Sequence, residues 1–245
     1  MVRKVLAAFA ATALAGALVV WVTQAGASPG VGSKAKANYE PVLNPANFVG
    51  VIDNAYFPLP VGRTLIYRGT KDGQSIVDRV KVTNQTKVIE GITARAVSDV
   101  STHRGTVLEK TTDWYAQDAT GTVWYLGEDT KAFDPDGTVD TSGSWQAGVH
   151  DGEPGIIMEA NPQIPDGYRQ EYAAGEAEDT AWIVNTGGSM TVPYGKVHKV
   201  LTSLEFARIE PGVIDQKIYA PGIGIVLERS MTGPLEVDRL VRVSG

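Results

Sequence analysis

Acidic residues form the densest group of side chains in this sequence that could do chemistry. Glu171, Glu176, Glu178 and Asp179 lie within the segment EYAAGEAED. Two carboxylates that lie close together can raise the pKa of one of them and then serve as acid and base, as in the cleavage of sugars. The alternative is a group of surface acids, which an acidic protein is expected to carry. Glu171 and Asp179 are the candidates for acid–base catalysis in this segment.

A histidine beside a carboxylate gives the second pair of catalytic candidates. His150 is followed by Asp151 in the segment VHDGEPG. A carboxylate can orient a histidine as a general base, and the alternative is a partly exposed loop histidine. The other histidines, His103 and His198, are distant in sequence, and the three share no metal-binding spacing.

Three aspartates invite comparison with a calcium-binding loop. Asp134, Asp136 and Asp140 stand around Pro135 and Gly137. A calcium loop needs oxygen ligands at alternating positions, a sharp turn at glycine and a closing bidentate acid. Here the glycine comes one position after the second aspartate, and no glutamate closes the loop. The pattern favours a solvated turn, and no metal site is predicted.

Several other kinds of chemistry are excluded or lack a motif. The 245 residues include no cysteine, which excludes disulfides, thiolate metal sites and a cysteine nucleophile. No nucleophile elbow, phosphate-binding loop or dinucleotide-binding glycine motif follows a predicted strand. We therefore expect no cofactor.

Aromatic residues on predicted strands give the leading prediction of a ligand site. Two strands each carry a Trp-Tyr pair, which places one aromatic ring on each face. In a barrel alternate residues point inward, and an interior lined with Trp and Tyr suits an apolar ligand with one polar group. The alternative is a filled core. The predicted ligand-binding residues are Trp114, Tyr115, Trp124, Tyr125, Trp145, Tyr168, Arg169 and Tyr172.

The elements that position these residues are predicted to be β-strands. Runs rich in β-forming residues alternate with Gly, Pro and Asp turns, at 64–68, 75–83, 87–100, 106–117, 122–127, 168–172, 180–184, 196–209, 213–219, 225–231 and 235–243. The clearest hairpin turn is at 118–121, and a turn at Glu90-Gly91 is predicted to divide 87–100 into two strands. This spacing predicts a mainly β protein, an antiparallel meander that forms a barrel or a strongly curved sheet. Residues 171–182 also fit a helix, although Gly175 interrupts it.

Composition divides the chain into three parts. Residues 1–27 resemble a signal peptide, with Arg3 and Lys4, an apolar run at 5–22 and the small residues AGA before the cleavage point. An uncleaved membrane anchor is the alternative. Residues 28–60 are predicted to form a flexible leader and an irregular strap, and residues 61–245 a single β-rich domain. Within it, 128–167 is predicted to be a long irregular loop, either a lid over a site or a structural cap.

The charge balance limits the partners. The chain has 22 Lys and Arg against 28 Asp and Glu, a net charge of −6. Removal of residues 1–27 takes away two cations, so the mature charge is 20 − 28 = −8. An acidic protein is a poor binder of nucleic acid. The expected partner is a small-molecule or lipid ligand, with membrane contact only through an uncleaved signal segment, and nothing in the sequence indicates an oligomeric state.

Several segments resemble a group of exported bacterial proteins that has no assigned activity. The similar segments are NAYFPL at 54–59 with Gly62 and Tyr67, DWYAQDATGTVWYLGE at 113–128, residues 145–160 around PGIIMEA, YRQEYAAGEAED at 168–179, VPYG at 192–195 and YAPGIGIVLE at 219–228. The resemblance implies a single β-rich domain that is secreted or held in the cell envelope. It implies no site residues.

Three functional hypotheses follow. The leading one is an exported β-barrel-like protein that binds a small or lipidic ligand in an aromatic-lined interior. The alternative is an extracellular hydrolase or isomerase without a cofactor, which uses His150 with Asp151 or Glu171 with Asp179. The third is a structural envelope protein that binds a partner along a long exposed edge strand.

Overall fold

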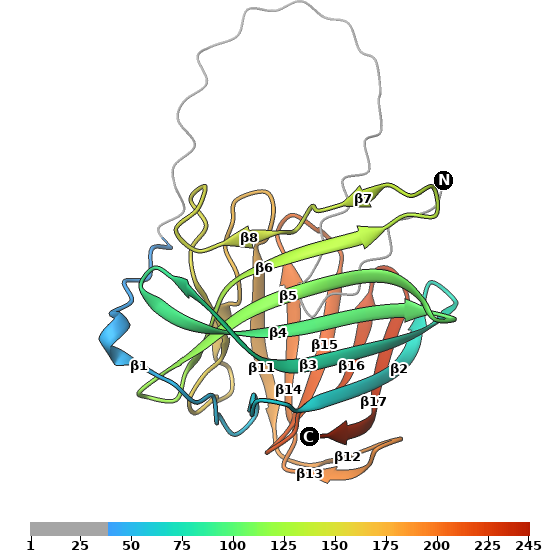
Figure 1. Ribbon diagram of the computed structural model, residues 1–245. Helices are drawn as coiled ribbons and strands as arrows, with labels where there is room; N and C mark the ends of the chain where they lie inside the picture. The colour runs from blue at the N-terminus through green and yellow to red at the C-terminus, as the bar shows by residue number, and fades with distance from the viewer. Residues whose placement is uncertain (1–38) are drawn as a thin grey trace, which may run out of the picture.

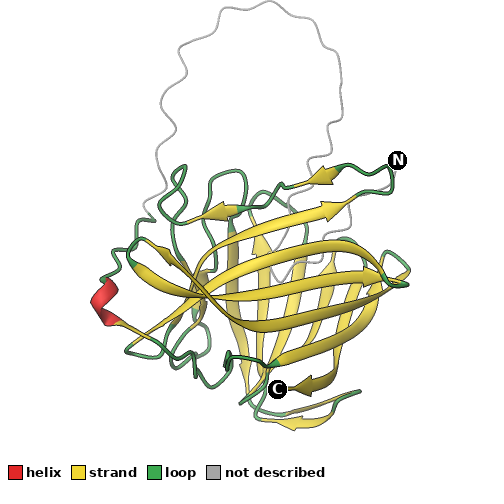
Figure 2. Ribbon diagram, in the orientation of Figure 1, coloured by secondary structure: helices red, strands yellow, loops and turns green. Residues whose placement is uncertain are grey.

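The computed structural model describes residues 39–245, so the predicted signal peptide and most of the leader lie outside the described residues. Strands make up nearly all the regular structure, and one short 3-10 helix, η1 (Pro45–Asn47), precedes them (Figure 2). The strands are β1 (Phe48–Val49), β2 (Thr64–Lys71), β3 (Gln74–Ile89), β4 (Ile92–His103), β5 (Thr106–Asp118), β6 (Val123–Phe133), β7 (Val139–Asp140), β8 (Trp145–Gln146), β9 (Gly155–Met158), β10 (Gly167–Arg169), β11 (Asp179–Thr186), β12 (Ser189–Val192), β13 (Gly195–His198), β14 (Leu201–Ala207), β15 (Ile214–Ala220), β16 (Gly224–Thr232) and β17 (Glu236–Ser244).

Fifteen of these strands form one antiparallel sheet. Its path runs β10-β11-β14-β15-β16-β17-β2-β3-β4-β5-β6-β7, and β12 and β13 form a separate hairpin. Neighbours in sequence are mostly neighbours in the sheet, and the last strand, β17, pairs with β2. The predicted mainly β, antiparallel meander is confirmed.

The sheet curls on itself, so that β3 to β6 lie in front of β14 to β16 (Figure 1). Its path of paired strands ends at β7 and β10, and the pairing does not form a closed barrel ladder. The two ends nevertheless approach each other, because β9 pairs with β6 and Glu153 forms a single antiparallel bridge with Tyr172. The strands therefore enclose an inner face.

Gly155 allows a close approach of two backbones at this junction. A Cβ atom at Gly155 would lie 1.9 Å from the carbonyl oxygen of Gln170 and 2.7 Å from the nitrogen of Glu171. Both atoms belong to the backbone, so they cannot move aside as a flexible side chain would. Only glycine fits here.

Gly155→Ala is expected to lower the free energy of unfolding by about 1–3 kcal/mol, the usual cost of overpacking. Denaturant unfolding measures the change. Gly50→Ala is the matched control, since a Cβ atom there meets nothing within 4 Å. Equal stability of the two variants would contradict the close approach.

Turn residues lie where the hairpins need them. Glu90 and Gly91 both have positive φ angles, +49° and +79°, between β3 and β4, as a primed turn requires. In the predicted hairpin at 118–121, Asp118 Oδ1 accepts hydrogen bonds from the backbone nitrogens of Thr120 and Thr122. Both predicted turns are confirmed.

The segment 128–167 contains more regular structure than expected. β6 continues to Phe133, and β7, β8 and β9 fold back to pair with it. Each of these added strands is only two to four residues long, so no local pattern announces it. The alternative helix at 171–182 does not form, because 173–177 is a turn and β11 begins at Asp179.

Asn54 anchors the irregular strap to the sheet. Its side-chain nitrogen donates to the carbonyl oxygens of Gly121 and Glu159, both at 2.9 Å, and its side-chain oxygen accepts from the nitrogens of Tyr56 and Phe57. Ile52 and Leu59 of the strap join the hydrophobic core. These contacts agree with a strap that covers one end of the domain.

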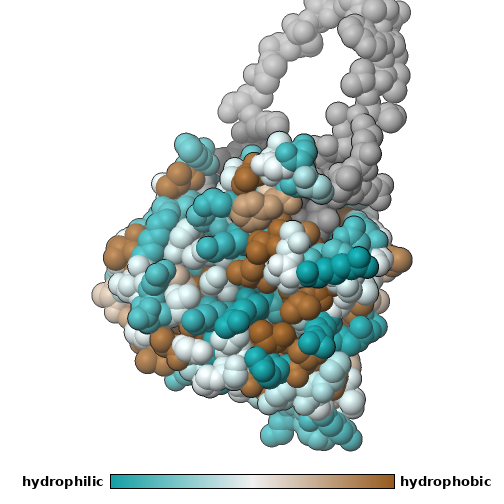
Figure 3. All heavy atoms as spheres, turned by 45° about the vertical axis from the view of Figure 1, so that its right-hand side comes forward, coloured by the Kyte–Doolittle hydropathy of each residue, from teal (hydrophilic) through white to brown (hydrophobic). Residues whose placement is uncertain are grey.

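On the face shown in Figure 3, apolar residues lie scattered between hydrophilic ones. Single exposed apolar residues are normal on soluble proteins and mark no site by themselves. Between residues 39 and 245, no helix has the length and apolar character to cross a membrane.

Candidate functional site

The long strands carry apolar residues at one end of the inner face and ionisable residues at the other. β5 begins with the buried Glu109 and Asp113 and continues to the buried Tyr115. β4 runs the opposite way, and its buried Asp99 lies opposite Thr111, between the two acids of β5. Because the two strands are antiparallel, the acids near the start of β5 lie beside the acid toward the end of β4. The inner face therefore has an apolar half and a carboxylate-rich half.

The carboxylate-rich half, as we name it, gathers acids from nearly every long strand. Its members are buried or half-buried: Asp78, Asp99, Glu109, Asp113, Glu128, Glu171, Asp179, Glu205, Asp215, Glu228, Glu236 and Asp238. Among the described residues, the buried cations are Lys71 and Lys217. Burial disfavours the charged form of a carboxyl group, so this half is expected to hold several protons at neutral pH.

Asp99 has the most isolated carboxylate of this group. Its side chain is buried, and neither oxygen has a hydrogen-bond partner in the structure. Burial, and then the charges of Asp78 and Asp113, raise its pKa well above the usual range. Glu228, on the distant strand β16, also contributes to this shift. Asp99 therefore faces across the interior.

Tyr125 links two acids of β5 and β6. Its hydroxyl oxygen lies 2.6 Å from Asp113 Oδ1 and 3.2 Å from Glu128 Oε2. The phenol has one proton to donate, so one carboxyl must carry its own proton to satisfy both contacts. Burial raises the pKa of Asp113 to about 7 and that of Glu128 well above its usual range.

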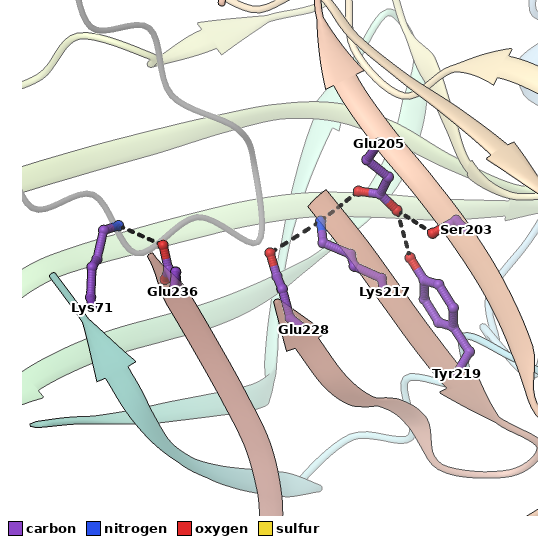
Figure 4. A network of polar contacts seen from close by, with 7 residues as sticks. All are labelled: Lys71, Ser203, Glu205, Lys217, Tyr219, Glu228 and Glu236. Atoms are coloured by element: carbon purple, nitrogen blue, oxygen red, sulfur yellow. Dashed lines mark hydrogen bonds and ion pairs between the residues drawn. The ribbon is translucent and has the colours of Figure 1, made fainter. Parts of the chain in front are cut away.

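Lys217 is the central cation of a network on β14, β15 and β16 (Figure 4). Its Nζ lies 2.7 Å from Glu205 Oε2 and 3.8 Å from Glu228 Oε1. Glu205 Oε1 also accepts hydrogen bonds from Ser203 and Tyr219. Burial lowers the pKa of Lys217, but the charges of the two glutamates outweigh burial and leave that pKa well above its usual range.

The two acids that the sequence singles out for catalysis lie close together. Glu171 is only 1% exposed and Asp179 only 4%. Burial, followed by the charges of Asp179 and Glu128, raises the pKa of Glu171 well above its usual value. A protonated and an ionised carboxyl side by side could act as acid and base, so catalysis here stays a prediction.

An open pocket of about 350 Å³ lies between β5, β6, the turn after β8 and residues 173–176. It brings together three residues that the sequence names, Trp114, Trp145 and His150. The complete lining is Lys87, Trp114, Glu128, Asp129, Ser144, Trp145, Gln146, Val149, His150, Ala173, Ala174 and Glu176. We call this the tryptophan pocket.

Backbone geometry positions the polar groups of the tryptophan pocket. Lys87 Nζ lies 3.9 Å from the centre of the Trp114 ring, a cation–π contact that places a donor beside the aromatic surface. His150 and Asp151 are exposed and both have positive φ angles, +50° and +61°. His150 lines the pocket, whereas Asp151 is not among the lining residues.

Other predicted aromatic residues fill the interior. Tyr115 stacks on Tyr125 with ring centres 4.7 Å apart, and Trp145 meets Tyr125 edge-on at 5.4 Å. The apolar half retains a small cavity of about 40 Å³ that Tyr67 and Tyr115 help to line. These rings belong to the hydrophobic core cluster.

The remaining predicted ligand-binding residues lie outside the tryptophan pocket. Trp124 Nε1 donates to Asp118 Oδ2, which ties the hairpin together. Arg169 stacks over the ring of Tyr172 at 4.7 Å and faces Tyr39 at 5.5 Å. Tyr168 is buried in the core cluster. These residues do not converge with Trp114.

The three aspartates of the calcium comparison each accept hydrogen bonds in their own turn. Thr138 donates to Asp134 and Asp136, and Ser142 donates to Asp140. Over residues 39–245, no group of three acids or histidines has the arrangement of a metal site.

Sequence reasoning missed most of the carboxylate-rich half. The sequence does hold a signal for this half: pairs of acids in predicted strands are separated by an even number of positions and therefore share a face. Examples are Glu109 with Asp113 and Glu236 with Asp238. An acid within a strand is normally taken to face solvent, and these acids face inward instead.

No protein-family model matches this chain, and no curated protein is similar to it in sequence. Two solved structures are similar in shape. One is a protein from Bacteroides fragilis NCTC 9343 that is proposed to be exported and has a YmcC-like fold (TM-score 0.46, 14% identity, 78% of this chain and 100% of that chain). The other is a proposed lipoprotein from Parabacteroides distasonis ATCC 8503 (TM-score 0.41, 12% identity, 78% of this chain and 100% of that chain).

Proposed function

We propose that this protein is an exported binding protein that holds a small polar ligand in the tryptophan pocket. The observation that carries the proposal is the convergence of Trp114, Trp145 and His150 around about 350 Å³, a volume within the usual range of small-molecule sites. The signal-like segment at the N-terminus supports export.

The lining of the pocket favours a neutral ligand with hydroxyl groups and one apolar face, as in a sugar ring. Trp114 offers an aromatic surface, while Lys87 and His150 can donate hydrogen bonds. Asp129 and Glu176 can accept them. One cation, Lys87, lines the pocket together with the acids Glu128, Asp129 and Glu176, so an anionic ligand would meet net repulsion.

A lipidic ligand in the aromatic interior has less support. The cavity in the apolar half is about 40 Å³, close to the roughly 30 Å³ that one water molecule occupies in the liquid. An acyl chain needs far more space. Residues 128–167, which supply Ser144 to His150, would serve as the movable wall of the tryptophan pocket.

Titration of the tryptophan fluorescence with glucose, N-acetylglucosamine and their oligosaccharides tests the proposal. We expect saturable binding of at least one of them. Trp114→Ala is expected to weaken it about tenfold or more, since the stacking surface is lost. Trp182→Ala is the matched control, because Trp182 is 55% exposed on β11 and packs on Phe206, away from the pocket. Equal affinities of the two variants, or no binding at all, would reject the proposal.

Catalysis is a second candidate function. It is favoured by the closeness of Glu171 and Asp179, and by Glu128, which lines the pocket and whose charge acts on Glu171. A hydrolase or isomerase would change the bound sugar, so product analysis after the same titration separates this function from binding. A partner that adds a strand has no such support, since the path of the sheet ends in strands of two and three residues.

A further inference from the structure

We infer that the carboxylate-rich half of the inner face is a second binding site, which accepts a linear aliphatic polyamine. The site is distinct from the tryptophan pocket. Three observations carry the inference: the position of the buried lysines, the buried oxygens without donors and the row in which the acids lie.

The first observation is the position of the buried cations. Lys217 lies against Glu205 and Glu228, and Lys71 lies 3.2 Å from Glu236. Both lysines therefore stand among the acids of β14 to β17. The acids of β3, β4 and β5 include Asp78 and Asp99. Within residues 39–245 neither forms an ion pair with a lysine, although the charge of Lys71 lowers the pKa of Asp78.

The second observation is that several buried oxygens lack donors. Both oxygens of Asp99, and one each of Asp78, Asp238 and Glu171, are buried without a hydrogen-bond partner among residues 39–245. Asp99 is 4% exposed and Glu171 only 1%. A buried acceptor without a donor destabilises the fold, and such groups commonly mark a place where a ligand supplies the donor. An ammonium group has several N–H donors and the opposite charge.

The third observation is that the acids form a continuous row. Asp78 on β3 lies opposite Ser101, two positions from Asp99 on β4, and Asp99 lies opposite Thr111, between Glu109 and Asp113 on β5. Asp113 lies directly opposite Glu128 on β6, and the charge of Glu128 acts on Glu171. The row therefore leads from Asp78 to Glu171 through β4, β5 and β6.

A row of anionic groups matches a chain of ammonium groups better than a single ion. A metal ion needs several ligands around one point, and the part of the chain that the structure describes holds no such group. A linear polyamine places cations at intervals along a flexible apolar chain.

The rim of the carboxylate-rich half gives a route for entry. Lys71 and Glu236 stand at the ends of β2 and β17, beside the turn at 72–73. The Glu236 side chain keeps 22% of its surface exposed. A cation could exchange with Lys71 at this ion pair before it reaches Asp238 and Asp78.

Isothermal titration of the full chain with spermidine near neutral pH tests the inference. We expect saturable binding and a higher melting temperature, which equal concentrations of sodium or magnesium chloride do not reproduce. Asp99→Asn and Glu171→Gln are each expected to weaken binding about tenfold, because a charged hydrogen-bonded partner is lost. Without ligand both variants should melt no lower than the parent, since each replaces a buried acid, costly to desolvate, with a neutral amide of nearly the same shape.

Two controls make the result specific. Asp136→Asn changes an exposed acid in the turn after β6 and should leave spermidine affinity unchanged. Trp114→Ala should also leave it unchanged, so the two proposed sites fail or succeed separately. Three results would overturn the inference. They are no binding of spermidine, an unchanged affinity in both Asp99→Asn and Glu171→Gln, or an equal rise in melting temperature with magnesium chloride.

Discussion

The protein is expected to be more stable at about pH 5 than at about pH 8, which is opposite to the behaviour of a protein held by surface salt bridges. Burial raises the pKa of Asp215 to about 6, of Asp113 to about 7 and of Asp238 to about 8. In the unfolded chain these groups regain their ordinary pKa of 3.8. The folded state therefore binds protons that the unfolded state has already lost.

The sign follows from proton linkage. A carboxyl group with a raised pKa stabilises the fold fully below its unfolded pKa, and this stabilisation is lost as the pH rises through its folded pKa. The window lies between about pH 4 and pH 8 for the three aspartates. The shift at Asp113 alone corresponds to on the order of 4 kcal/mol. Lys217, whose pKa is raised, keeps its charge throughout this window.

Urea unfolding at a series of pH values measures this effect. The free energy of unfolding should fall steadily from about pH 5 to about pH 8. Asp99→Asn should reduce the slope, because a group with a raised pKa no longer titrates. Asp136→Asn, which alters an exposed acid, should keep the parent's slope. A stability that rises over this range would show that the inner acids stay ionised at little cost.

Local sequence signals sufficed to predict the long strands β3 to β6. Alternating β-forming residues and primed turns such as Glu90-Gly91 depend only on neighbouring residues, and they located β3 to β6. The short strands β7, β8 and β9 were not predictable in this way. They form by pairing with β6. A segment of two to four residues is too short to show a strand pattern of its own.

The site was predictable only in part, because it depends on which face of each strand turns inward. Trp114 and His150 stood out as residue types, but their meeting in one pocket depends on how the turn after β8 folds back. Glu171 and Asp179 were close in sequence, which made their pairing a reasonable hypothesis. Asp99 and Glu228 lie on different strands across the interior, so only the curled sheet brings their charges together.

Loss of the Lys217 cation is expected to have the largest effect of any single substitution discussed. Lys217→Met keeps the apolar stem but leaves Glu205 and Glu228 without their common counter-charge. Removing one partner of a buried ion pair typically costs about 3–5 kcal/mol, because the remaining charge stays desolvated. The free energy of unfolding near neutral pH, measured with urea, should fall by about this amount.

The dependence of this loss on pH and on a second substitution identifies its cause. Burial already raises the pKa of Glu228, so at about pH 5 this glutamate can accept a proton and the loss should be smaller than at about pH 8. Glu205→Gln combined with Lys217→Met removes one of the stranded charges and should restore part of the stability. Lys131→Met is the matched control, since Lys131 pairs with Asp129 on the surface and both side chains are about half exposed. If Lys217→Met lost no more stability than Lys131→Met, Lys217 would not be neutralising Glu205 and Glu228. The acids of the carboxylate-rich half would then have to lose their charge by protonation alone.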